Sequence, residues 1–268
     1  MNKEDLVSVI MPTYNAGKYL ADSMNSILNQ TYKNLELLIT DDASTDPTTL
    51  QLLKEYASKD KRVNILYLKE NHGAGYARNK SIERAKGRYI AFCDSDDRWT
   101  TDKLEKQIAF MNKKKCALSC ASYIIFDGET QEEIGFCTAP KKITYGMMKR
   151  DNKVGCLTAI YDVQMLGRKF FMPTIRKRQD WALFLQIIRE CKVCYAYPEK
   201  PLAYYCMRRN SISSNKMSLM KYNIAVYKEI LGFHPIKANL YFFTLFLPTY
   251  GAKIMKRKFD SYTFTHKK

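Results

Sequence analysis

The sequence predicts an α/β protein built on a parallel, doubly wound sheet. Short apolar runs alternate with amphipathic helical patterns over the first 110 residues, and this alternation is typical of such sheets. The chain has 268 residues, of which 46% are hydrophobic and 13% aromatic. This composition excludes an intrinsically disordered protein and is sufficient for a large core.

Four apolar runs are expected to be the strands of this sheet, and each is apolar enough to be buried on both faces. They cover residues 6–11, 35–40, 63–68 and 88–93. The segments between them repeat apolar residues every three or four positions, which predicts helices that pack on the sheet.

The second half of the chain is less regular. A helix is expected over 103–115, a strand over 116–126, a polar turn over 127–133, a short strand near 155–160, a strongly amphipathic helix over 180–190, strands over 193–197 and 202–207, and a helix over 219–231.

Positive charge is concentrated in the last quarter of the chain. The formal net charge is +17, and residues 200–268 contribute +11 of it. Such an excess predicts an anionic partner, which could be a nucleic acid, a membrane surface or a phosphorylated substrate.

The chain starts MNKEDLVSVIMP, so no signal peptide is expected and its eight cysteines are predicted to be reduced thiols. Cys191 and Cys194 form a C-x-x-C pair without the further ligands that a structural zinc site needs. Buried thiols are therefore expected there.

A polar loop follows each of the four predicted strands, over 12–15, 41–44, 70–79 and 94–97. In open α/β sheets, ligands bind outside the carboxyl ends of the strands. We therefore expect these four loops to converge on one site.

Asp94, Asp96 and Asp97 are the strongest signal for chemistry in these loops. Carboxylates so close together repel each other unless a cation lies between them, and their oxygens suit Mg²⁺ or Mn²⁺. The alternative is a solvated acidic turn that caps the helix beginning near Thr101. The position at a strand end favours the metal.

Asp42 and Tyr14 suggest a nucleotide base. Asp42 could accept the ring N–H of a pyrimidine, and Tyr14 could stack on it. Alternatively, Asp42 forms a turn or caps the helix near Pro47, and Tyr14 packs in its loop.

Arg78 follows Gly75 near a helix start, where a diphosphate is electrostatically favoured; the alternative is a surface salt bridge. Residues 73–75 lack the third glycine of the dinucleotide fingerprint. An NAD-binding site is therefore weakly supported.

Asp180 begins an amphipathic helix directly after the basic run 176–178. The helix dipole and the cations favour its ionised form, which suits a general base. A helix-capping role is equally consistent with the sequence.

Four segments together resemble the family 2 glycosyltransferases, most closely bacterial members that build teichuronic acid, O antigen or capsule. They are VSVIMPTYNAGKYL, LLITDDASTD, ENHGAGYARNKSIERAKGRYIAFCDSDD and RQDWALFLQIIRE. The likeness extends from residue 6 to residue 214. It implies a GT-A fold and an inverting transfer of a sugar from a nucleotide diphosphate-sugar.

The resemblance also implies roles for individual residues. Those on the donor side are Pro12, Tyr14 and Asn15 in the nucleotide pocket, Asp42 on the base, Arg78 beside base and ribose, Asp94 near the ribose and Asp96 on Mn²⁺ or Mg²⁺. Asp97 has no counterpart role. Asp180 matches the acceptor-activating base, although Gln179 stands where many relatives have Glu. Residues 208–213 match a loop that folds over the diphosphate.

With these roles, residues 1–215 are expected to form the catalytic domain, with a nucleotide-sugar-binding half (1–115) and an acceptor-binding half (116–215). Residues 216–268 would be a basic, partly apolar helical extension. The expected partners are a nucleotide-sugar donor, most simply a UDP-sugar, and a carbohydrate acceptor that a lipid could carry.

The extension contains an apolar run over 238–252 that is followed by four cations. Because Pro248 breaks it and it is shorter than the ~20 residues that span a bilayer, we expect peripheral contact with an anionic membrane at its cytoplasmic face. The alternative is packing on the catalytic domain or on a second subunit.

Two other function classes remain open at this point. One is a nucleotide-binding oxidoreductase, and the other is a basic membrane- or nucleic-acid-binding module without catalysis. No base-reading motif is recognisable, so nucleic acid is not an expected partner.

Overall fold

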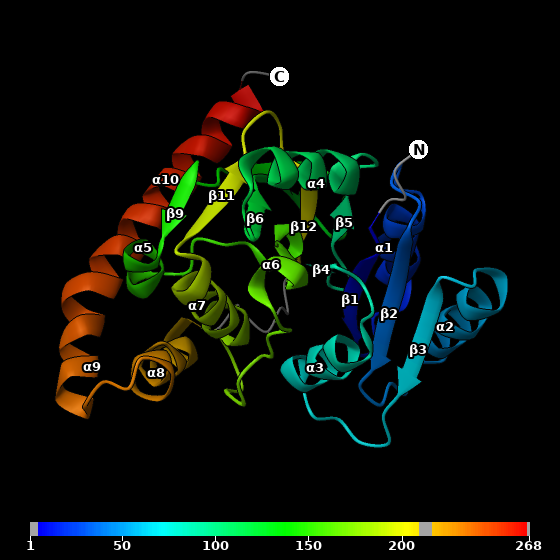
Figure 1. Ribbon diagram of the computed structural model, residues 1–268, viewed down its shortest axis with the longest axis horizontal. Helices are drawn as coiled ribbons and strands as arrows, with labels where there is room; N and C mark the ends of the chain where they lie inside the picture. Colours follow the sequence, from blue (N-terminus) through cyan, green and yellow to red (C-terminus); the bar gives the residue numbers. More distant parts are fainter. Residues whose placement is uncertain (1–4, 209–215, 267–268) are drawn as a thin grey trace.

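A computed structural model describes residues 5–208 and 216–266. In this part of the chain the strands form an eight-stranded sheet, in the order β3-β2-β1-β4-β10-β6-β11-β9, and a smaller four-stranded sheet, in the order β5-β12-β7-β8. Helices cover the sheets, and one long helical segment runs along a side of the molecule (Figure 1).

The four predicted N-terminal strands form the parallel part of the large sheet. They are β1 (Val7–Thr13), β2 (Leu35–Asp41), β3 (Val63–Tyr67) and β4 (Tyr89–Phe92). β1 lies between β2 and β4, and β3 pairs with the outer side of β2. The predicted parallel sheet is therefore confirmed for this half of the chain.

Helices pack on both faces of this sheet, as a doubly wound fold requires. In β1, Val7, Val9 and Met11 belong to one apolar core, and Ile10 belongs to the core on the opposite face. The first core includes side chains of α1 (Leu20–Leu28), α2 (Pro47–Lys59) and α4 (Lys103–Lys114), and the second includes those of α3 (Ala74–Arg84) and α7 (Gln179–Cys191).

The expectation that all four strands are buried on both faces is wrong for β3. Only Val63 is buried there, and Tyr67 is exposed. β3 is the edge strand of the sheet, so only one neighbouring strand and one helix cover it.

The second half of the chain completes both sheets. β10 (Ile160–Asp162) lies antiparallel between β4 and β6 (Leu118–Ala121), and β11 (Val193–Tyr197) runs parallel to β6. The outer strand is β9 (Lys142–Thr144). The small sheet consists of β5 (Arg98–Trp99), β12 (Ala203–Met207), β7 (Tyr123–Asp127) and β8 (Glu133–Cys137).

Some expected elements of this half differ from the structure. The single strand expected over 116–126 is two strands, β6 and β7, which belong to different sheets. The short strand expected near 155–160 is a 3-10 turn (Cys156–Thr158) that leads into β10. β8, β9, α5 (Tyr145–Arg150) and α6 (Val163–Leu166) were not expected, because short elements carry too few residues for a clear periodicity.

The prediction that the two thiols of the C-x-x-C pair are buried is confirmed for Cys194 and only in part for Cys191. Cys194 is fully buried, and its thiol lies 3.7 Å from that of Cys120. Burial raises the pKa of Cys194 well above its ordinary value. Cys191 is half-buried.

The C-terminal segment is helical almost throughout. α8 (Lys216–Ala225) and a π-helical turn (Val226–Ile230) precede α9 (Pro235–Tyr241), a second π-helical turn (Phe242–Phe246) and α10 (Leu247–His266). The expected break at Pro248 is therefore wrong. Proline removes a main-chain hydrogen bond of the helix, and the π-helical turn directly before it is the kind of irregularity at which helices absorb such a mismatch.

One face of the α9–α10 segment packs on the rest of the molecule. Phe246 stacks near Trp181 of α7, and Phe264 near Phe136 of β8, with ring centroids 5.6 Å apart in both pairs. Ser261 accepts a hydrogen bond from the backbone of Phe136. Because this segment shares the core of the preceding residues, the division of the chain at residue 215 stays a prediction.

The segment also carries seven large apolar side chains that are exposed, alongside exposed cations. We call these side chains the apolar stripe; they are Ile236, Leu240, Phe243, Leu247, Met255, Phe259 and Tyr262. No helix in the described ranges is both long and apolar enough to cross a membrane.

Candidate active site

The loops after β1 and β2 are joined by Asn15. Its side-chain Oδ1 accepts hydrogen bonds from the backbone N–H of Thr45 (2.8 Å) and Asp46 (3.0 Å), and its own N–H donates to Ser44 Oγ (2.9 Å). Asn15 has φ +45°, a left-handed conformation that asparagine tolerates better than most residues. Asn15 therefore acts as a clamp between two loops, and its place in a nucleotide pocket stays a prediction.

The two neighbours of this clamp that were expected to line the pocket differ in exposure. Tyr14 is 52% exposed, so its ring is available for stacking. Pro12 is buried inside β1, opposite Thr40 of β2. The contact of Tyr14 with a base stays a prediction, whereas Pro12 forms part of the strand end that precedes Tyr14.

Asp42 is buried and connects the loop after β2 to the start of α3. Its two carboxylate oxygens accept the backbone N–H groups of His72 (2.8 Å) and Gly73 (2.7 Å). The helix near Pro47 is capped by Asp46, which accepts the N–H of Thr49, so Asp42 does not cap it. Each carboxylate oxygen has a further lone pair, and contact of Asp42 with a base stays a prediction.

Arg78 projects from α3 towards the loop after β4. It is only 8% exposed, and its Nη2 donates to Asp94 Oδ1 at 2.5 Å, so the alternative of a surface salt bridge is wrong. Burial by itself lowers the pKa of Arg78, but the nearby charges, Asp94 foremost, raise it above its ordinary value. Arg78 Nε is buried and has no hydrogen-bond partner within the described ranges, which leaves one donor for a ligand.

Asp96 faces a second arginine. Its Oδ2 lies 2.5 Å from Arg208 Nη2, at the end of β12. Burial and the charge of Asp94 raise the pKa of Asp96, and Arg208 opposes that shift. Residues 209–213 of the loop expected over the diphosphate lie outside the described residues.

Asp97 now has a structural role that the sequence did not indicate. It is 3% exposed and accepts the backbone N–H of Cys206 in β12 at 2.9 Å. Burial and the charges of Asp96 and Asp94 hold its pKa well above its ordinary value. Asp97 therefore anchors the acidic loop to the small sheet.

The two remaining carboxylates of the acidic loop, Asp94 and Asp96, suit a cation that also binds oxygen atoms of the substrate. Within residues 5–208 and 216–266, no group of three or more His, Cys, Asp or Glu side chains is arranged to hold a metal ion. Mg²⁺ commonly binds through one or two carboxylates plus substrate phosphates. Asp94 and Asp96, each paired here with an arginine cation, fit that pattern.

Asp180 is the second residue of α7. Its negative charge contributes to raising the pKa of Arg78, as that of Asp94 does. The cap position of α7 is Arg178, so the alternative that Asp180 caps the helix is wrong. The side chain of Gln179 packs directly on Gly75 of α3, where a Cβ would lie 2.9 Å from Gln179 Cγ. The start of α7 is thereby held against the start of α3.

Asn152 and Lys253 are two residues near Asp180 that the sequence analysis missed. Asn152 Nδ2 donates to Asp180 Oδ2 at 2.8 Å. Lys253, on α10, donates to the backbone oxygen of Asn152 (2.5 Å) and pairs with the buried carboxylate of Asp151 (3.0 Å). These contacts span 28 and 101 residues of the chain, so no local pattern indicates them.

The residues therefore form two groups that α3 connects. Asp42 holds the start of this helix, and Arg78 lies one turn further along it. The group around Tyr14 and Asp42 has an exposed aromatic ring, and the group around Asp94, Arg78 and Asp180 has carboxylates and a buried cation. Together they offer a stacking surface, binding groups for anions or a cation, and a carboxylate that could accept a proton.

Comparison with known proteins identifies the family of this chain. The family model described as glycosyl transferase family 2 matches residues 8–170. The Bacillus subtilis protein TuaG, named as a teichuronic acid biosynthesis glycosyltransferase, is 43% identical over 238 residues, which are 89% of this chain and 93% of TuaG. The Escherichia coli protein WfgD is 38% identical over 216 residues, which are 81% of this chain and 83% of WfgD. Its name is UDP-Glc:alpha-D-GlcNAc-diphosphoundecaprenol beta-1,3-glucosyltransferase.

Solved structures share the fold. Staphylococcus aureus TarS 1–349, in complex with UDP-GlcNAc, superimposes with a TM-score of 0.67 and 21% identity, covering 88% of this chain and 70% of that chain. A mannosyltransferase from Pyrobaculum calidifontis, in complex with GDP-Man and Mn²⁺, superimposes with a TM-score of 0.66 and 16% identity, covering 95% of this chain and 75% of that chain. The fold expected from the sequence, a GT-A-type sheet with a helical tail, is confirmed.

Proposed function

This chain belongs to glycosyl transferase family 2, and we propose that it transfers a sugar, with inversion, from a nucleotide diphosphate-sugar to a hydroxyl of a lipid-linked bacterial surface polysaccharide precursor. The observation that carries the proposal is the ion pair of the buried Arg78 with Asp94, at 2.5 Å, because it places a cation and a carboxylate at the end of the sheet where open α/β folds bind their ligands. Family membership removes the oxidoreductase and the non-catalytic binding module as alternatives.

The donor is proposed to be a UDP-sugar that binds over the loops after β1, β2 and β4. Tyr14 would stack on the uracil, with Pro12 and Asn15 forming the strand end around it, and Asp42 would accept the ring N–H. Asp94 would contact the ribose, and Arg78 would lie beside base and ribose. The name of WfgD, which specifies UDP-Glc, supports this choice of nucleotide.

Asp96 is proposed to hold Mn²⁺ or Mg²⁺ together with the substrate diphosphate. When bound, such an ion acts as a Lewis acid that stabilises negative charge on the leaving diphosphate. Arg208 pairs with Asp96 here. When a divalent cation binds Asp96 in place of the Arg208 guanidinium, Arg208 would turn towards the substrate diphosphate.

Asp180 is proposed to be the general base. As the acceptor hydroxyl attacks the anomeric carbon, its proton passes to Asp180, and the bond between that carbon and the diphosphate oxygen breaks with its electron pair on the oxygen. A single displacement inverts the configuration and needs no sugar–enzyme intermediate. The hydrogen bond from Asn152 orients the carboxylate for this transfer.

A thermal-shift panel of nucleotide sugars, with and without Mn²⁺, tests the donor proposal. We expect a UDP-sugar to stabilise the protein only when Mn²⁺ is present, and Asp96→Asn to lose that effect. Asp22→Asn, at an exposed carboxylate of α1, serves as the matched control. Equal stabilisation of the wild type and Asp96→Asn would overturn the metal role, and a product that retains the donor's anomeric configuration by NMR would overturn the single displacement.

The C-terminal segment is proposed to lie on the cytoplasmic face of the membrane. The apolar stripe would enter the interfacial region, and the exposed cations Arg257 and Lys258 on the same helix would meet anionic headgroups. Partition onto vesicles of phosphatidylglycerol and phosphatidylethanolamine tests this. Because Phe242 and Phe246 belong to the core, substitution is a cleaner test than deletion of the segment.

For that test, Phe259→Glu should weaken vesicle binding, because Phe259 is 70% exposed on the apolar stripe. Met165→Glu, at an exposed methionine of α6, should not change it. Equal partition of the two variants would contradict the membrane proposal without affecting the transferase proposal.

A further inference from the structure

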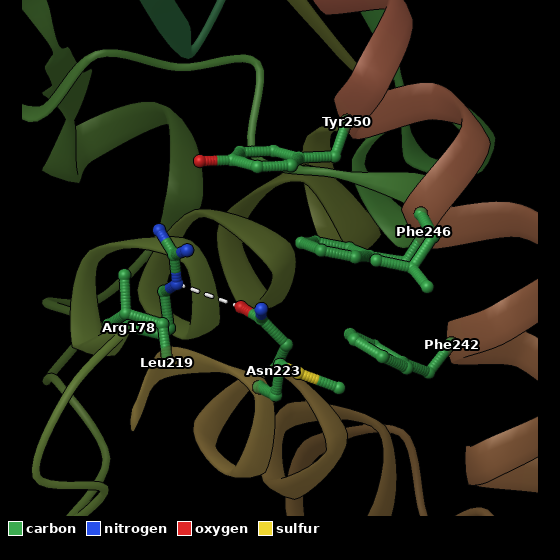
Figure 2. A pocket seen from close by; sticks show the side chains of 8 residues that line it. Arg178, Leu219, Asn223, Phe242, Phe246 and Tyr250 are labelled. Atoms are coloured by element: carbon green, nitrogen blue, oxygen red, sulfur yellow. Dashed lines mark hydrogen bonds between the residues drawn. The ribbon is translucent and has the colours of Figure 1, made fainter. Parts of the chain in front are cut away.

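An apolar cavity of about 190 Å³ lies between α8, the start of α7 and the C-terminal helices (Figure 2). One wall is a ladder of aromatic rings: Phe242 stacks on Phe246 at 5.2 Å, and Phe246 on Tyr250 at 5.5 Å. The remaining lining residues are Arg178, Leu219, Met220, Asn223 and Leu247.

This cavity shares two helices with the surroundings of Asp180. Arg178, which lines the cavity, precedes Asp180 by two residues at the start of α7. Tyr250, on the opposite wall, lies about one helical turn before Lys253, which donates a hydrogen bond to the backbone of Asn152, the hydrogen-bond partner of Asp180. The cavity therefore lies between the same helices, α7 and α10, that position the proposed general base.

The cavity also leads to the apolar stripe. Leu247 belongs to both, since it lines the cavity and is 38% exposed. Met220, on the other side of the cavity, is 37% exposed. Apolar side chains thus continue from the cavity to the face of the protein proposed to contact lipid.

Among the described residues that line the cavity, the one cation is Arg178. Arg178 has φ +71°, a backbone conformation that non-glycine residues rarely adopt, and its Nε donates to Asn223 Oδ1 at 2.8 Å. Figure 2 shows its guanidinium between Asn223 and the ring of Tyr250. An arginine held at one end of an apolar cavity matches a ligand with an anionic head and an apolar chain.

We propose that this cavity binds the first part of the prenyl chain of a prenyl diphosphate-linked acceptor, with Arg178 on the diphosphate. The inference rests on the proposed lipid-linked acceptor and assigns its binding site. Ligand pockets commonly measure about 300 Å³ or more, so a cavity of about 190 Å³ would hold only the units nearest the diphosphate. The rest of the chain would follow the apolar stripe into the membrane.

Direct binding of farnesyl diphosphate, measured by calorimetry on the full chain in EDTA, tests this site. EDTA removes divalent cations, so binding of the diphosphate at Asp96 is suppressed. We expect farnesyl diphosphate to bind and inorganic diphosphate to bind much more weakly. Met220→Trp, which fills the cavity from its exposed edge, should weaken farnesyl diphosphate about tenfold or more, because burial of one aliphatic group of this size is worth that factor.

Arg178→Ala should weaken the same ligand about tenfold, since it removes a hydrogen bond to a charged group. The matched controls are Met165→Trp, at an exposed methionine of α6, and Arg189→Ala, at the other end of α7. Both should bind farnesyl diphosphate as the wild type does. Equal binding in Met220→Trp and Met165→Trp, or equal affinity for inorganic diphosphate, would overturn the inference.

Transfer assays separate this result from the proposed function. Met220→Trp should raise the KM for a long-chain prenyl acceptor and leave the KM for the nucleotide-sugar unchanged. If the wild type binds no nucleotide-sugar and transfers no sugar, the proposed function fails. If the wild type transfers sugar, and the acceptor KM of Met220→Trp and of Met165→Trp is the same for short and long prenyl chains, only the prenyl site fails.

Discussion

The two sides of the candidate active site are built differently. On the donor side, Asp42 and Asn15 accept main-chain N–H groups that lie about thirty residues away, in the next strand-end loops. On the acceptor side, Asp180 is oriented by the side chain of Asn152, which in turn is held from α10 by Lys253, 101 residues further along the chain.

The two sides are therefore expected to differ in how readily substitutions change the ligand that each side binds. A loop held by several main-chain hydrogen bonds is fixed by the parallel sheet that carries it, so we expect the proposed nucleotide site to depend little on side chains outside the sheet. A carboxylate that is held through two long-range side-chain contacts depends on helices outside the sheet. Acceptor specificity is expected to change through those contacts.

The largest effect is expected for Asp180→Asn. Loss of a general base typically lowers turnover by about 10²–10⁴-fold. Asparagine is nearly isosteric, so stabilisation by the nucleotide-sugar should be unchanged in a thermal-shift assay. Glu190→Gln, at the opposite end of α7, serves as the control, and turnover of Asp180→Asn within a factor of a few of the wild type would contradict the base assignment.

Asp42→Asn should mainly affect the donor side. The NH₂ group of the new asparagine would face the backbone N–H of His72 or Gly73, which is itself a hydrogen-bond donor. A buried N–H group left without an acceptor lowers the free energy of unfolding by roughly 1–3 kcal/mol. We expect a lower melting temperature and a donor Kd raised about tenfold. Asp46→Asn is the matched control, since asparagine caps helices as well as aspartate does; equal loss in both variants would mean that Asp42 has no special role.

Asn152→Ala should affect only the acceptor side. A hydrogen bond to a charged group is worth roughly 1.5–3 kcal/mol, so kcat should fall about tenfold while the KM for the nucleotide-sugar stays unchanged. Asn152→Asp should be worse, because it places a second negative charge beside Asp180. A rise in the donor KM with unchanged kcat would show that Asn152 does not position the base.

The smallest effect is expected for Lys253→Met. Lys153 also pairs with Asp151, at 3.1 Å, so the loop around Asn152 keeps part of its support. Lys253 is partly exposed, and Lys153 keeps the buried carboxylate of Asp151 paired, so we expect a cost of roughly 1 kcal/mol or less, which corresponds to a loss of kcat of about fivefold at most. Lys256→Met, which breaks a pair within α10, is the control.

A double-mutant cycle between positions 152 and 253 tests whether α10 influences the proposed base, Asp180, through Asn152. If Lys253 acts through Asn152, the effects of Asn152→Ala and Lys253→Met on kcat should be less than additive. Additive effects would mean that α10 and the base are independent.

Much of the donor side could be predicted from the sequence. The strand–helix alternation predicts the parallel sheet, and the sheet's own geometry brings residues 12–15, 41–44 and 94–97 to one edge. The identities of Tyr14, Asp42, Arg78 and Asp96 then suggest the kind of ligand. The hydrogen bonds that hold the acidic loop were not predictable. Asp97, for example, accepts the backbone N–H of Cys206, which belongs to a strand of the other sheet.

On the acceptor side, the sequence predicted the helix that begins near Asp180 and little of its surroundings. Asn152, the cavity at Arg178 and the continuation of the C-terminal helix through Pro248 appear only in the folded chain. None of these features repeats with a helix or strand period, so no pattern along the chain reveals them.

The sequence by itself determined the sheet, the polar loops at its edge and the chemical groups available there, because local periodicity and strand direction follow from neighbouring residues. The tertiary structure alone decided which carboxylate of the acidic loop is structural, what orients Asp180 and where an apolar chain could enter. Those outcomes depend on side-chain packing between segments that lie up to a hundred residues apart, and packing of that kind leaves no trace in sequence order.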